Sequence, residues 1–173
     1  MSDIVPDGKD WTWVLHRRCP ECAFDASAVD PRGIGEAMRA AVPRWRAALA
    51  RPDVRRRPAP TVWSPVEYGA HVRDVFGVFD ERLRLLLAHD DPLFADWDQD
   101  AAAVAARYDL QDPVTVSDEL AAAAARFAAA IDAVPGDAWD RPGRRSDGSV
   151  FTVATLGAYV LHEVAHHLHD VGA

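Results

Sequence analysis

Apolar residues recur every three to four positions in four segments of the chain, which is the spacing of a helix with one buried face. In the second segment they run from Tyr68 to Leu87, and in the last from Leu156 to Val171. The other two segments carry the stripe Ile34–Leu49 and an alanine-rich stretch between Val116 and Ile131. The pattern predicts helices over about residues 31–51, 65–89, 114–133 and 153–170.

Helix-start signals agree with this periodicity. Ser64-Pro65-Val66-Glu67 combines a capping box with Pro at the first helical position. Asp30-Pro31 and Asp112-Pro113 each pair an N-cap carboxylate with Pro, and Thr152 caps the last predicted helix. Residues 138–151 carry Pro-Gly and Asp-Gly turn signals, which predict one small hairpin. The sequence therefore predicts an all-α fold.

The linker between the second and third predicted helices, about 20 residues, is long for neighbours in a bundle. A helix of about 25 residues is about 37 Å long, and such a linker can run back along it. We therefore expect a four-helix bundle with a long crossover between helices two and three. Residues 31–173 are assigned to this bundle, and residues 1–30 to an irregular N-terminal arm.

Composition narrows the class of protein. The chain has 173 residues, 49% of them hydrophobic and 27% charged, which suits one globular domain. A formal net charge of -8 argues against nucleic acid or an anionic membrane as the main partner, so we expect a small-molecule substrate. No apolar run is long enough for a membrane span, and no signal peptide is evident, so we expect a cytoplasmic protein. The sequence leaves open whether it forms a homodimer.

Most of the histidines fall in the last predicted helix, between His162 and His169. His162 and His166 are one turn apart, so their imidazoles share a helix face and are spaced to bind one divalent cation. His169 lies on the adjoining surface. The alternative is a solvated polar face near the helix end, where His also suits the helix dipole. The repeated spacing favours a metal site.

The stretch His162-Glu163-Val164-Ala165-His166 also matches H-E-x-x-H, in which the Glu of a zinc protease is the general base. The extended motif requires Gly before a third His, whereas here His169 precedes Gly172. No strand pattern for a protease sheet lies upstream. A hydrolytic role for Glu163 is therefore the weaker hypothesis. Its side chain projects about 100° from that of His162 and also fits a solvent-facing helix charge.

His71 of the second predicted helix is in register with Tyr68 and Val75, so it points inward. A single inward His is more often a hydrogen-bonded core residue than a metal ligand. Beside a His pair that needs a third ligand, it completes a site of three nitrogens with open positions for water or substrate. The predicted ligands are His71, His162 and His166.

The arm contains His16-x-x-Cys19-Pro20-Glu21-Cys22. Two sulfurs at this spacing share a metal or form a disulfide. A structural zinc site needs four ligands, and His16 offers a third while no fourth is evident. A thioredoxin-type pair would need a βαβ context, which the sequence lacks. We interpret Cys19 and Cys22 as structural or incidental thiols, with a zinc knuckle and a redox pair as alternatives.

The segment from Trp63 to Val72, with Ser64-Pro65 and His71, is followed by His162-x-x-x-His166-His167-x-His169. Over residues 31–172 this resembles the DinB-like superfamily of bacterial four-helix metalloproteins. The resemblance implies one metal ion bound by His71, His162 and His166. His169 replaces a Gln of many members, which implies a residue that supports a ligand or adds one. Zinc suits neutral imidazoles best, and nickel or iron would also fit.

The superfamily includes thiol-dependent S-transferases and the mycothiol-dependent maleylpyruvate isomerase, together with many members of unknown activity. The resemblance implies metal-dependent transfer of a low-molecular-weight thiol, with mycothiol as a candidate, to a small electrophile. A metal beside an open position deprotonates a bound thiol. Two alternatives stay open: a non-catalytic metal-binding bundle, and a metal-dependent hydrolase that uses Glu163.

Overall fold

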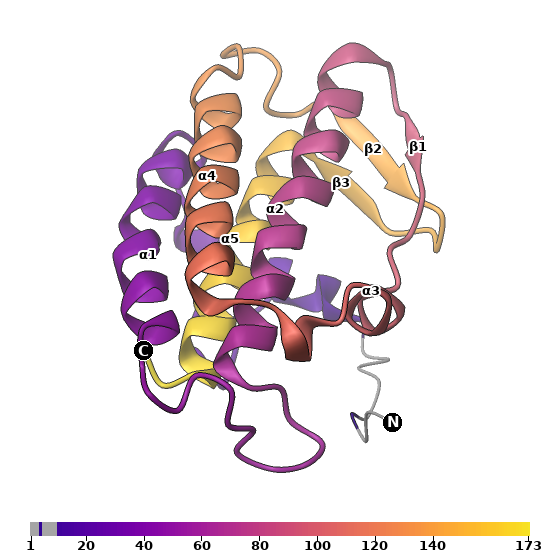
Figure 1. Cartoon of the computed structure of the whole chain (residues 1–173). Coiled ribbons are helices and arrows are strands. Elements are labelled where there is room, and N and C mark those ends of the chain that lie inside the picture. The colour runs from indigo at the N-terminus through magenta and orange to yellow at the C-terminus, as the bar shows by residue number, and fades with distance from the viewer. Residues whose placement is uncertain (1–3, 5–9) are drawn as a thin grey trace.

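Four long helices form the body of the molecule (Figure 1), whose computed structural model describes residue 4 and residues 10–173. They are α1 (Ile34–Leu49), α2 (Pro65–Ala88), α4 (Pro113–Asp132) and α5 (Val153–Asp170). Each coincides with one of the helices predicted from apolar spacing, so the mainly helical fold is confirmed. None of the helices in this part of the chain is both long and apolar enough to span a bilayer.

The predicted caps account for where these helices start. Glu67 accepts hydrogen bonds from the amide and the hydroxyl of Ser64, at 2.8 and 2.6 Å, which closes the capping box of α2. Asp112 accepts from the Thr115 amide at 2.9 Å at the start of α4. At Asp30 the cap instead begins a 3₁₀ turn, Pro31–Gly33, and α1 starts directly after it.

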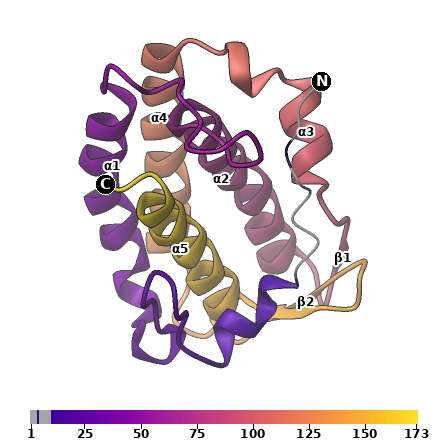
Figure 2. The same ribbon diagram turned by 90° about the horizontal axis from the view of Figure 1, so that it is seen from below.

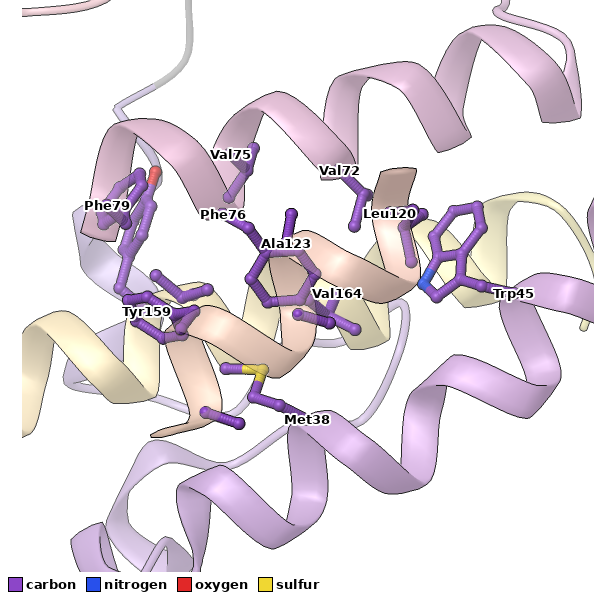
Figure 3. Close-up of a cluster of buried hydrophobic side chains, with 14 of the residues drawn as sticks. Met38, Trp45, Val72, Val75, Phe76, Phe79, Leu120, Ala123, Tyr159 and Val164 are labelled. Carbon is purple, nitrogen blue, oxygen red and sulfur yellow. The ribbon is translucent and has the colours of Figure 1, made fainter. Parts of the chain in front are cut away.

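The helices surround one core in the order α1, α4, α2, α5, because α4 and α5 each pack against both α1 and α2. After α2 the chain returns along the bundle through β1 (Leu93–Phe94) and α3 (Gln99–Ala105) before α4 begins (Figure 1). Side chains from all four main helices fill the space between them (Figure 3), among them Met38, Trp45, Phe76, Leu120 and Val164.

A small sheet beside the bundle corrects the all-α prediction. The predicted hairpin is present as β2 (Pro142–Arg145) and β3 (Val150–Thr152), which pair in antiparallel fashion. The unpredicted strand β1 joins β2 in parallel, with Leu93 opposite Arg144. Because β1 is only two residues long, it shows no alternation of polar and apolar positions that could have indicated it.

The N-terminal arm is an ordered cover over α5 (Figure 2). Its 3₁₀ turns Trp11–Leu15 and Ala26–Ala28 both contact that helix, and Val14 and Cys19 are fully buried. The beginning of the predicted arm, residues 1–3 and 5–9, lies outside the described residues. The arm thus buries a face of α5 that the other helices of the bundle leave uncovered.

Candidate metal centre

Helix α5 carries two pairs of potential ligands, offset by one residue. His162 and His166 form one pair, and Glu163 and His167 form the other. Members of each pair are one turn apart, and the two pairs point about 100° away from each other. Because of this offset the two pairs face different elements. Glu163 and His167 face α2, whereas His162 and His166 face the N-terminal arm.

The first donor group consists of His71, Glu163 and His167, whose donor atoms all lie within 4.8 Å of one another. One oxygen of Glu163, Oε2, is 3.7 Å from His71 Nε2 and 3.5 Å from His167 Nε2. The rings of His71 and His167 meet edge to face, with centroids 4.9 Å apart. We call this set the α2–α5 group.

His71 in this group has the environment expected of a ligand. Its side chain is completely buried, and neither ring nitrogen has a hydrogen-bond partner within the described part of the chain. A buried polar atom without a partner is costly, and a bound ion would supply the missing partner. The described side chains thus provide none of the hydrogen bonds expected of a core histidine.

The second donor group consists of Cys19, Cys22, His162 and His166, whose donor atoms also lie within 4.8 Å of one another. Cys19 Sγ is 3.7 Å from His166 Nδ1. We call this set the arm–α5 group. His16, the third ligand considered from the sequence, is exposed and belongs to neither group among the described residues.

The structure thus divides the predicted ligands: His71 lies in the α2–α5 group, and His162 and His166 lie in the arm–α5 group. The reason is the rotation of α5, which buries Val160 and Val164 in the bundle. On a helix, His162 points about 160–200° away from those two valines.

Sequence reasoning missed His167, which is one turn beyond Val164 and so turns toward α2. The apolar stripe of α5 was the signal that could have found it. The structure also places His169 and Glu163. His169 is exposed and lies outside both groups in the described part of the chain. The side chain of Glu163 is only 12% exposed, so it is not a solvent-facing charge.

A carboxylate holds His167 in place. The Nδ1 atom of His167 lies 2.8 Å from an oxygen of Asp170, so the opposite nitrogen, Nε2, is the one that faces Glu163. Metal-binding histidines commonly donate their second ring N–H to a carboxylate, which fixes both the tautomer and the ring orientation. The pair therefore resembles a ligand with its supporting residue.

The charges of the α2–α5 group depend on one another. Burial raises the pKa of Glu163, but the rings of His162, His167 and His71, which approach its carboxylate to 3.5–3.7 Å, outweigh burial and hold that pKa well below the usual value. Burial lowers the pKa of His71 and keeps the ring neutral. Burial also lowers the pKa of His167, yet its hydrogen bond with Asp170 and the nearby Glu163 carboxylate overcome this effect and raise the pKa to about 9. A carboxylate anion and a neutral imidazole are the forms that bind metals, and a cation would compete with the proton on His167.

A pocket of about 240 Å³ opens beside both groups. Its walls combine aromatic rings with carboxylates, and they come from the arm, α2, α3, α5 and the loop before α2. The aromatic residues are Trp11, Trp63, Tyr68 and Tyr159, and the acidic ones include Glu21, Asp100 and Asp170. Because Glu163 and His167 also line it, a molecule in the pocket would be next to the α2–α5 group.

The fold and the two donor groups define a helical bundle with a candidate metal centre. Residues 34–171 match the sequence profile of the DinB superfamily, and the chain belongs to that superfamily. Among solved structures it is similar to YfiT from Bacillus subtilis, with a TM-score of 0.72 and 17% sequence identity. The match covers 82% of this chain and 85% of YfiT.

YfiT is described as a probable metal-dependent hydrolase with an unusual four-helix bundle topology. At this level of identity the likeness shows a shared fold. No match was found among curated proteins.

Proposed function

We propose that the protein is a metal-dependent enzyme in which the α2–α5 group binds a divalent cation and a thiol attacks a small electrophile beside it. One observation carries the proposal: the donor atoms of His71, Glu163 and His167 converge within 4.8 Å at the side of a pocket. Three protein ligands are the number that leaves a position open for a substrate.

The residues of this group fit a divalent cation. Two imidazoles and a carboxylate suit zinc, and nickel or iron accept the same donors. The unpartnered ring nitrogens of His71 and the orientation of His167 by Asp170 both support this fit. When bound, the cation would lower the pKa of a coordinated thiol and supply a thiolate near neutral pH.

The pocket favours a small substrate. Its volume of about 240 Å³ is too small for a folded partner and suits a compact organic molecule. Trp63 and Tyr159 would contact the apolar part of the electrophile, and Asp100 would meet a polar group of the thiol. Membership of the DinB superfamily favours a low-molecular-weight thiol, with mycothiol as the first candidate. Because such thiols stay reduced in the cytoplasm, we place the protein there.

Hydrolysis is the second candidate. Two histidines and a glutamate are also the ligands of several zinc hydrolases, and YfiT is described as a probable metal-dependent hydrolase. Water would then replace the thiol as the nucleophile. In this arrangement Glu163 is a ligand. It differs from the H-E-x-x-H hypothesis, in which His162 and His166 bind the metal and Glu163 is the base.

The test compares thiol and ester substrates on zinc-loaded protein. Wild type, His71→Ala and the exposed control His169→Ala are assayed with a reduced thiol plus monochlorobimane and, separately, with nitrophenyl esters. We expect turnover of the thiol reaction in the wild type and the control, and its loss in His71→Ala with helicity unchanged by circular dichroism. Turnover of esters alone would favour the hydrolase. Bound metal without turnover of either substrate would indicate a non-catalytic metal-binding bundle.

A further inference from the structure

The arm–α5 group is a second place where metal-binding side chains converge. Cys19 and Cys22 come from the arm, and His162 and His166 come from the last helix. Cys19 and His162 are 0% and 1% exposed, and both cysteines are free thiols. Two sulfurs and two imidazole nitrogens are a donor set typical of structural zinc.

We propose that these four side chains bind a zinc ion in a closed Cys₂His₂ site, distinct from the α2–α5 group. Four protein ligands leave no position for a substrate, which is the property of a structural site. Thiolate ligands also select zinc over magnesium, calcium or manganese. The arm and α5, which pack against each other, would then also be bonded through the ion.

The cysteine turn is already shaped for this role. The Cys19 amide donates to the Phe24 carbonyl at 2.8 Å, and the Ala23 amide donates to the Cys19 carbonyl at 3.0 Å. Ala23 takes a left-handed conformation, with φ of 63°, which reverses the chain after Cys22. This reversal keeps Cys19 and Cys22 together, with both sulfurs within 4.8 Å of ring nitrogens of His162 and His166.

The histidines of the group are also placed as ligands. His166 directs Nδ1 toward Cys19 at 3.7 Å, while its Nε2 lies 3.6 Å from Glu21 Oε2 and 3.8 Å from Asp170 Oδ1. A carboxylate beside the second nitrogen is the usual support for a metal-binding imidazole. Both ring nitrogens of His162 are buried and lack a hydrogen-bond partner in the described part of the chain.

A redox pair explains less of this geometry than zinc does. A disulfide between Cys19 and Cys22 would leave the buried nitrogens of His162 without a partner, at a cost of about 1–3 kcal/mol per group. A zinc ion would use one of those nitrogens together with both sulfurs. Aromatic rings enclose the site, since Phe24 lies 5.4 Å from the His162 ring and Trp11 lies 5.0 Å from the His166 ring.

The site would hold one wall of the pocket in place. Trp11 and Glu21 belong to the arm and line the pocket, together with His162 and His166. Glu163 of the α2–α5 group also approaches the arm–α5 group, because its Oε1 is 3.7 Å from His162 Nδ1 while its Oε2 is 3.7 Å from His71 Nε2. The two centres are adjacent, but sulfur is present only in the arm–α5 group, so a sulfur-specific signal separates them.

Cobalt substitution provides that signal, because thiolate ligands give Co²⁺ a charge-transfer absorption in the near ultraviolet. The full chain is titrated with Co²⁺ and then with Zn²⁺, and bound zinc is counted by elemental analysis. We expect the wild type to show the band and to bind two zinc ions. The double variant Cys19→Ser/Cys22→Ser should lose the band and one zinc ion. His71→Ala and the exposed control His16→Ala should both keep the band.

The outcomes separate this proposal from the proposed function. A double variant that keeps the wild-type zinc content would overturn the Cys₂His₂ site, and so would wild-type protein that lacks the band. Loss of zinc in His71→Ala bears only on the α2–α5 group. If His71→Ala keeps two zinc ions while the double variant loses one, the Cys₂His₂ site stands and the proposed function fails.

Limited proteolysis tests the same site without changing a ligand. The exposed residues Arg17 and Arg18 precede the cysteine turn and are natural trypsin sites. In the His71→Ala variant, removal of zinc by a chelator should accelerate cleavage after them several-fold, and added zinc should restore protection. Equal cleavage rates with and without zinc would count against the site.

Discussion

The imidazole of His167 and the carboxylate of Asp170 lie 2.8 Å apart on α5, and this contact aims the other ring nitrogen at Glu163. The two residues are three positions apart, which brings their side chains together on the helix surface. The contact prepares His167 to bind a cation in one orientation. The contact also predicts which neighbouring residues should affect metal affinity most when they are substituted.

Asp170→Asn should weaken metal binding at the α2–α5 group by about 10–100-fold, the effect usual for a residue that supports a ligand. Asp170 also lies 3.8 Å from His166, so the measurement is made in the Cys19→Ser/Cys22→Ser background. Competition with a chelator gives the affinity. The exposed neighbour His169 provides the control, because His169→Ala should bind as tightly as the parent. An unchanged affinity in Asp170→Asn would show that His167 needs no such support.

Glu163→Gln should weaken metal binding more than Asp170→Asn does. It removes an anionic metal ligand, whereas Asp170→Asn removes only a residue that supports a ligand. The loss of metal affinity should be larger than the loss of about 10–100-fold that is typical for substitution of a supporting residue. Glu163→His is the matched variant, because it keeps a donor atom at this position and should retain most of the binding. Isothermal titration with Zn²⁺ measures all three proteins. Wild-type affinity in Glu163→Gln would remove Glu163 from the ligand set.

Glu67 should make stability depend on pH in the acid range. Burial raises the pKa of its carboxyl, but hydrogen bonds from Arg57 and Ser64 outweigh this and lower it. The charged form therefore stabilises the fold fully above the unfolded carboxyl pKa of about 4.3, and this contribution disappears as the pH falls through the lower native pKa.

Glu67→Gln should cost about 1–3 kcal/mol at pH 7, because the Arg57 guanidinium keeps its charge and loses the Glu67 carboxylate with which it forms an ion pair. The stability of the variant should also fall less steeply than that of the wild type between about pH 5 and pH 3. Urea unfolding at a series of pH values measures both effects. Parallel stability curves for the two proteins would mean that Glu67 titrates normally in the native state.

Phe127→Ala should lower the free energy of unfolding by about 3–5 kcal/mol, the usual cost of removing a large aromatic core residue. Phe127 is completely buried on α4 and packs against Phe76, with ring centroids 5.9 Å apart. Val114→Ala on the same helix is the control. The side chain of Val114 is 70% exposed, so its replacement should change the free energy of unfolding by no more than about 0.5 kcal/mol. Similar unfolding midpoints for the two variants would show that Phe127 does not contribute to the core in this way.

Helix positions could be predicted from the sequence because their signals are local. The capping box at Ser64 and the caps at Asp112 and Thr152 identify the starts of α2, α4 and α5 without any knowledge of packing. Strand β1 could not be found in this way, because its two residues are defined by their pairing with Arg144 and Arg145. That pairing depends on how the whole chain folds.

The candidate metal centre was predictable only in part: several of its histidines could be named from the sequence, but not how the donor side chains are grouped. His71 was identified because it points inward from α2, and the histidines of α5 because they are spaced by one turn. Spacing alone cannot decide between His162 with His166 and Glu163 with His167, because both pairs are separated by four residues. The rotation of α5 decides it, because this rotation turns Glu163 and His167 toward His71 and leaves His162 and His166 facing Cys19 and Cys22 of the arm. That contact joins residues 147 positions apart, between Cys19 and His166.

This separation has a consequence for the order of events on the ribosome. The arm is synthesised well before α5, and the surface on which it packs emerges only after α1, α2 and α4 have been made. Contacts so distant in sequence close late and slowly during folding, because a long loop must be ordered first. We therefore expect Val14 and Cys19, which are fully buried in the folded protein, to be buried only after α5 has been synthesised. For the same reason we expect the part of the pocket wall that the arm provides to form late, although its residues are synthesised before the four main helices.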